Sequence, residues 1–84
     1  MKDKVLVKLV VPDIEETYDI FLPCNRKIGS IIKLINKAIP ELSNDLYKES
    51  TKNFLYNDET GNKYDLNVIL KDSDIRNGSR IVLF

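Results

Sequence analysis

Cys24 is the only cysteine among the 84 residues, and histidine is absent. The cysteine lies just before a predicted helix, and a helix N-terminus favours the reactive thiolate form. Without histidine, the chain lacks the base that most often activates a cysteine or serine nucleophile. A single cysteine also excludes an internal disulfide and the usual cysteine-based metal sites. We therefore interpret Cys24 as a turn residue and expect no enzyme; the alternative, a small enzyme that uses this thiol, would show rapid and selective alkylation.

Two further patterns match ligand or modification sites in part. Residues 58–64 alternate polar side chains as a calcium loop does, but the sixth position is not Gly and the twelfth is not Glu. Residues 77–79, Asn-Gly-Ser, match a glycosylation sequon, but no secretion signal precedes them. We interpret them as a tight turn instead. The alternating residues of the first pattern are Asp58, Thr60, Asn62 and Tyr64. We expect a solvated hairpin turn there, with no metal and no cofactor.

The composition is that of an ordinary globular chain, with 43% hydrophobic residues and 13 basic residues balanced by 13 acidic ones. This balance gives no global attraction to nucleic acid or to an anionic membrane. No apolar run of secretory length precedes Pro12, and no stretch approaches the roughly 20 apolar residues that cross a bilayer. We expect one cytoplasmic domain over residues 1–84, without nucleic-acid binding or membrane insertion.

The clearest element is an amphipathic helix over residues 26–39. Its apolar residues recur at the spacing that forms one stripe on a helix. The other side carries Lys27, Lys33, Asn36 and Lys37, and we interpret the lysine face as solvated. Asn25 is a plausible N-cap, and Pro40 is expected to end the helix. The residues of the stripe are Ile28, Ile31, Ile32, Ile35, Ala38 and Ile39.

Two strands are predicted before this helix, over residues 5–11 and 17–22. Lys8 and Asp19 must face water, and this sets the phase of each strand. The short connection favours an antiparallel hairpin. The alternation sends Val5, Val7, Leu9, Val11, Tyr18, Ile20 and Leu22 inwards, and Leu6, Val10 and Phe21 outwards.

The chain after the helix is predicted to contain a loop, a short strand at 53–57, a brief return strand at 63–66 and a final strand at 79–84. Alternation does not decide whether Leu55 or its neighbours Phe54 and Tyr56 face the core. In the final strand, Arg80 must face water, and the alternation then decides which of the other side chains point inwards. Candidate core residues are Leu42, Leu46, Tyr47, Leu70, Ile75, Ile81 and Leu83, while Val82 and Phe84 point outwards and Asn77-Gly78 form a tight reversal.

This order of elements indicates an α+β protein of the β-grasp, or ubiquitin-like, class. In that fold a mixed sheet of four to five strands packs on one central helix. The isoleucine stripe would form the core, and burial of each isoleucine contributes on the order of 2 kcal/mol.

Two segments, YDIFLPCNRKIGSIIKLI at 18–35 and LKDSDIRNGSRIVLF at 70–84, resemble a known family. They are similar to the YukD-like (EsaB-like) proteins, small ubiquitin-like proteins encoded with type VII (ESX-type) secretion systems of Gram-positive bacteria. The likeness includes the spacing of four residues between Pro23 and Ile28, and residues 40–67 match poorly. It also includes a Leu-x-Asp-x-x-Ile-x-x-Gly pattern carried by Leu70, Asp72, Ile75 and Gly78.

The resemblance implies a cytosolic accessory or regulatory component of the secretion machinery that works through protein contacts. The alternative on the same fold is a sulfur carrier or protein modifier, which needs a C-terminal Gly-Gly. This chain instead ends in a predicted strand at 81–84, which argues against conjugation. A third hypothesis is an N-terminal domain of a larger membrane component, because related domains occur fused to transmembrane segments.

The sheet face that turns away from the helix is the predicted binding surface. Its outward apolar residues are more than a monomer needs, and a contiguous apolar patch usually marks a partner site. Ile14 is expected to project from the first hairpin, and one residue of 54–56 to join the patch. We expect a protein partner, with a homodimer as the alternative. The predicted protein-binding residues are Leu6, Val10, Ile14, Phe21, Leu55, Val82 and Phe84.

Overall fold

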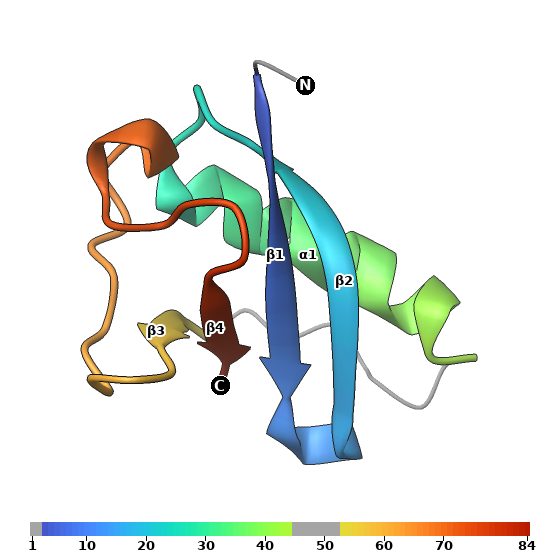
Figure 1. Ribbon diagram of the computed structural model, residues 1–84. Helices are drawn as coiled ribbons and strands as arrows, with labels where there is room; N and C mark the ends of the chain where they lie inside the picture. Colours follow the sequence, from blue (N-terminus) through green and yellow to red (C-terminus); the bar gives the residue numbers. More distant parts are fainter. Residues whose placement is uncertain (1–2, 45–52) are drawn as a thin grey trace.

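The computed structural model describes residues 3–44 and 53–84. Among them, one helix, α1, lies across one face of a four-stranded sheet of order β2-β1-β4-β3 (Figure 1). β1 pairs antiparallel with β2 and parallel with β4, and β3 pairs antiparallel with β4. The predicted β-grasp fold is therefore confirmed. The elements are β1 (Lys4–Val11), β2 (Glu16–Pro23), α1 (Ile28–Leu42), β3 (Leu55–Asn57) and β4 (Arg80–Leu83), with 3₁₀ turns at Pro12–Ile14 and Leu70–Asp72.

The hairpin of β1 and β2 follows the predicted alternation. Val7, Leu9 and Val11 are buried, whereas Lys8 and Phe21 are exposed. In the register, residues that face each other across the two strands share one side of the sheet. The isoleucines of α1 cover the inner side and are buried with apolar residues of β1 and β4 in one core cluster. Ala38, the remaining residue of the predicted stripe, is exposed.

The N-terminus of α1 differs from the prediction. Lys27, not Asn25, is the capping residue, and its side chain makes no capping hydrogen bond. Instead, the N–H of Ile28 donates to the carbonyl of Val68 at 2.9 Å, and the N–H of Gly29 donates to the carbonyl of Leu66 at 3.0 Å. Carbonyl groups from a segment distant in sequence therefore accept the hydrogen bonds that a capping side chain would otherwise accept.

The predicted end of the helix at Pro40 is wrong, because α1 continues to Leu42. Proline removes its own N–H, but its fixed φ is compatible with a helix, and residues 41 and 42 complete the last turn before Ser43 donates its N–H to the carbonyl of Ile39. The side chain of Leu42 is 52% exposed, so its predicted core role is also wrong. Leu46 and Tyr47 lie outside the described residues.

The C-terminal half completes the core largely as predicted. Leu70, Ile75, Ile81 and Leu83 are buried. Gly78 has a φ of +87°, the left-handed conformation that a tight reversal before β4 requires. The return strand expected at 63–66 is reduced to a single bridge between Tyr56 and Lys63.

One polar pair is buried beside this apolar core. The side-chain amides of Asn36, on α1, and Asn53, just before β3, exchange two hydrogen bonds of 2.9 and 2.7 Å. Both residues are at most 9% exposed, so the predicted outer position of Asn36 is wrong. A buried amide is expensive unless it is bonded, so each asparagine makes the other tolerable and the pair ties the helix to the start of β3.

Candidate protein-binding surface

The face of the sheet opposite α1 carries apolar side chains that the strand registers bring together. Leu6 faces Phe21 across β1 and β2. Val10 faces Val82 across β1 and β4, and Val82 faces Tyr56 across β4 and β3. These pairs come from four strands, and the parallel pairing of β1 and β4 is what places the two ends of the sequence side by side.

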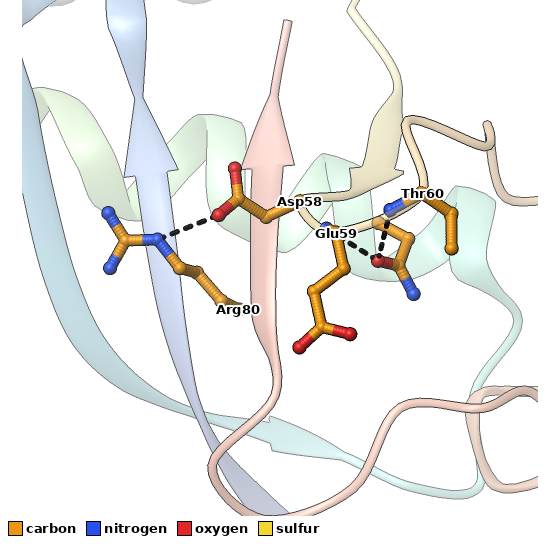
Figure 2. A network of polar contacts seen from close by, with 5 residues as sticks. Asp58, Glu59, Thr60 and Arg80 are labelled. Atoms are coloured by element: carbon orange, nitrogen blue, oxygen red, sulfur yellow. Dashed lines mark hydrogen bonds and ion pairs between the residues drawn. The ribbon is translucent and has the colours of Figure 1, made fainter.

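A row of charged side chains crosses the same face. Lys8 of β1 binds Asp19 of β2 at 3.1 Å, and the Nε of Arg80 on β4 binds the carboxylate of Asp58 at 2.9 Å. Lys8 and Arg80 are themselves neighbours in the parallel register. The row therefore runs acidic, basic, basic, acidic across the sheet, and Figure 2 shows its Arg80–Asp58 end.

This charged row divides the predicted patch in two. One side holds the Leu6–Phe21 pair. The other side holds the group that we call the C-terminal patch, made of Val10, Tyr56, Val82 and Phe84. Phe84 is 66% exposed, and together with Tyr56 and Val82 it lines a shallow depression of about 260 Å³. The C-terminal patch thus holds four of these residues, and the other side holds two.

Two of the predicted binding residues do not belong to this face. Leu55 is fully buried, because it pairs with the inward-facing Leu83 and cross-strand partners share one side of a sheet. Ile14 is half-buried and packs against the core instead of projecting from the hairpin. Tyr56, whose facing the sequence did not decide, takes the outward place assigned to Leu55.

The neighbour Phe54 exchanges two backbone hydrogen bonds of 3.0 Å with Phe84, one in each direction. The ammonium of Lys63 lies 4.3 Å from the centre of the Phe54 ring. The ring also lines a groove of about 460 Å³ beside α1, together with residues such as Ile32 and Leu66. Phe54 therefore lies at the β3 edge of the domain, paired with Phe84 of the C-terminal patch.

The acidic end of the charged row is held by a turn that Asn57 organises. Its side-chain oxygen accepts hydrogen bonds from the backbone N–H groups of Glu59 at 2.8 Å and Thr60 at 3.1 Å (Figure 2). Gly61, with a φ of +74°, completes the reversal. Residues 58–64 thus form the predicted hairpin turn, in which side-chain oxygens bind the backbone. No group of three or more potential metal-ligating side chains occurs within residues 3–44 and 53–84.

Tyr64 joins this turn to the segment before β4. Its hydroxyl donates to Asp74 at 2.6 Å, and the side-chain amide of Asn57 donates to the same carboxylate at 3.2 Å. Burial raises the pKa of Tyr64 above its ordinary value of about 10, and the hydrogen bond and the charge of Asp74 raise it further. The neutral phenol is therefore favoured in the folded state.

This raised pKa predicts an alkaline loss of stability. Below pH 10 the folded and unfolded states both keep the Tyr64 proton, and the stabilising contribution is complete. Above pH 10 the unfolded state releases the proton first, so stability falls as the pH rises towards the folded-state pKa. Urea unfolding at pH 8 and pH 11 should show a larger loss for the wild type than for Tyr64→Phe. An equal loss in both proteins would contradict this role.

Cys24 is half-buried and packs against the core. Its backbone N–H donates to the carbonyl of Asp3 at 2.8 Å, and its carbonyl accepts from the N–H of Lys71 at 2.9 Å. Both contacts are structural, because they fix the turn between β2 and α1. The structure thus gives Cys24 the place of a turn residue, as the sequence indicates.

Comparison with solved structures identifies the fold as ubiquitin-like. The ubiquitin-like domain of EccD5 from Mycobacterium xenopi matches with a TM-score of 0.81 at 16% identity, over 96% of this chain and 92% of that chain. The ubiquitin-like domain of the Mycobacterium tuberculosis type VII secretion system protein EccD1 matches with a TM-score of 0.75 at 15% identity, over 95% and 96%.

A chain of the MycP5-free ESX-5 inner membrane complex matches with a TM-score of 0.71 at 17% identity, over 98% of this chain and 21% of that chain. The sequence matches no protein-family model and no curated protein. Among the described residues, no helix has the length and apolar character needed to span a membrane.

Proposed function

We propose that residues 1–84 form a single ubiquitin-like domain that serves a type VII secretion system as a cytoplasmic, non-enzymatic interaction module. The likeness to the ubiquitin-like domains of EccD1 and EccD5 supports this, as does the YukD-like pattern of the sequence. The role is accessory or regulatory, and the partner is a protein of the secretion machinery.

The observation that carries the proposal is the C-terminal patch. Val10, Tyr56, Val82 and Phe84 contribute apolar surface from three strands, on the face that α1 leaves uncovered. Aromatic residues are the most frequent energetic centres of protein interfaces, and this patch contains two. The adjacent charged row, already paired within the sheet, gives the patch a polar border on one side.

The patch defines the partner surface in general terms. It fits an apolar protrusion that enters the depression between Tyr56, Val82 and Phe84. Hydrogen-bonding groups of the partner would lie over Arg80 and Asp58, which are about half exposed and hold each other in place. Such a partner excludes water from the apolar centre and leaves the charges at the solvated rim.

Phe84→Glu is expected to leave the fold intact and to weaken partner binding at least tenfold. The side chain is 66% exposed, so its replacement removes no core contact, while a carboxylate would be desolvated in the interface. A tenfold change corresponds to about 1.4 kcal/mol, which is in the range of one interface residue of this kind. The measurement is co-purification of secretion-machinery components with the tagged protein from its native cell.

Leu6→Glu is the matched control, because Leu6 is exposed on the same face but lies beyond the charged row. It should keep both the cooperative thermal transition and the partners. Undiminished co-purification with Phe84→Glu, or equal loss with both variants, would contradict a role for the C-terminal patch. Self-association that Phe84→Glu abolishes in sedimentation would indicate a homodimer instead.

A further inference from the structure

Among residues 3–44 and 53–84, β2 has a strand neighbour on one side and is an open edge of the sheet. The N–H of Cys24 donates to the carbonyl of Asp3 on the neighbouring strand, so this residue pair is hydrogen-bonded. Hydrogen-bonded and non-bonded pairs alternate along an antiparallel ladder, which directs the N–H and C=O groups of Thr17, Asp19 and Phe21 away from β1. Outside the strand ladders, no backbone hydrogen bond involves these three residues within the described part of the chain.

An apolar groove runs beside this edge. It measures about 110 Å³ and lies between the second half of β2 and the second half of α1. Figure 1 shows β2 as the outer strand over this part of the helix. Leu34, on the helix, is 44% exposed, and Leu42 is more exposed still. The lining residues are Ile20, Phe21, Leu22, Pro23, Leu34, Ile35, Ala38, Ile39 and Leu42.

The charge around the groove is asymmetric. The hairpin turn at the start of β2 carries three exposed carboxylates, of Asp13, Glu15 and Glu16, and none of them has an ion pair within the described residues. On the helix side the exposed Lys37 and Glu41 balance each other. The edge therefore has an acidic start and an apolar second half.

We infer that the β2 edge is a second docking site, for an extended segment of a partner protein that adds to the sheet as a fifth strand. Its backbone would bond to Thr17, Asp19 and Phe21. Because side chains alternate along a strand, every second residue would enter the groove against Leu34 and Ala38. A Lys or Arg at one end of the segment would lie over the acidic turn.

The geometry also limits the segment. Pro23 has no N–H, so pairing weakens at the end of β2, and the bonded stretch is about five residues long. This site goes beyond the proposed function, since it lies at the edge of the sheet and not at the C-terminal patch. The two sites use different residues and can be tested separately.

The test uses a synthetic peptide in which Val and Thr alternate after a Lys-Arg pair. Titrated into the ¹⁵N-labelled protein, it should shift the amide signals of Thr17, Asp19 and Phe21. Leu34→Glu and Ala38→Glu should weaken binding at least tenfold while circular dichroism remains native. Phe84→Glu should bind the peptide as the wild type does. If the peptide does not bind the wild type, the proposal for the β2 edge fails, and the co-purification result for the C-terminal patch is unaffected.

Two altered peptides separate the contributions of backbone and charge. N-methylation of alternate residues removes the donors that pair with β2 and should abolish binding. Replacement of Lys-Arg by Glu-Glu should weaken it. Equal binding by the N-methylated peptide, or shifts confined to Val82 and Phe84, would overturn the inference. Concentration-dependent shifts of the β2 amides without peptide would also overturn it, because a second copy would then occupy the edge.

Discussion

Ile31→Asp is expected to unfold the domain. Ile31 is fully buried on the face of α1 that packs against the sheet. A carboxylate there loses its hydration without gaining a partner, which costs several kcal/mol beyond the lost apolar contacts. A domain of this size keeps roughly 4–12 kcal/mol in total. Far-UV circular dichroism should show loss of the native spectrum, and the thermal transition should disappear.

Leu34→Asp is the matched control for this prediction. Leu34 lies one turn further along the same helix but is 44% exposed. The substitution keeps the carboxylate in water, so the free energy of unfolding should change by about 1 kcal/mol or less. A native transition in Ile31→Asp, or unfolding of both variants, would mean that the helix packs on the sheet by another face.

Asn36→Ala is expected to destabilise the domain by about 1–3 kcal/mol. The substitution removes both hydrogen bonds that the buried amide of Asn53 exchanges with Asn36. The remaining amide then stays in a buried position without these two bonds. The urea midpoint should fall, while the slope of the unfolding free energy against urea concentration should stay unchanged. This combination would indicate lost stability and not an altered denatured state.

The double substitution Asn36→Leu with Asn53→Leu separates pairing from burial. If the amides stabilise chiefly by satisfying each other, the double variant should lose less than the sum of the two single variants, because no amide is left behind. Lys37→Ala, at the exposed neighbouring position, should change stability by about 0.5 kcal/mol or less. Additive single losses would contradict a coupled pair.

Much of the fold is predictable because charged residues fix the phase of each strand. Lys8, Asp19 and Arg80 cannot be buried unpaired, so their strands can face the core in one way. The spacing of the isoleucines predicts the helix by the same logic. Its ends are not predictable locally, because carbonyls of Leu66 and Val68 take the place of a cap and because a proline in the last turn does not stop the helix.

The binding surface is less predictable, since it depends on pairing between distant segments. The register of β1 with β4 places Lys8 beside Arg80 and thereby divides the apolar face, and no local pattern encodes that register. The side that Leu55 faces is unpredictable for the same reason, because pairing with Leu83 fixes it. The open edge of β2 follows from the strand order, which the sequence of elements leaves undetermined.

The central position of β1 affects how the chain folds during its synthesis. β1 and β2 leave the ribosome early and can form their hairpin, but the other neighbour of β1 is β4, made some seventy residues later along the sequence. Until residues 80–83 emerge, the valine-rich β1 has an unpaired edge that can associate with other chains. Nascent chains stalled before residue 80 should therefore remain protease-sensitive and aggregate, whereas chains in which β4 has emerged should become resistant.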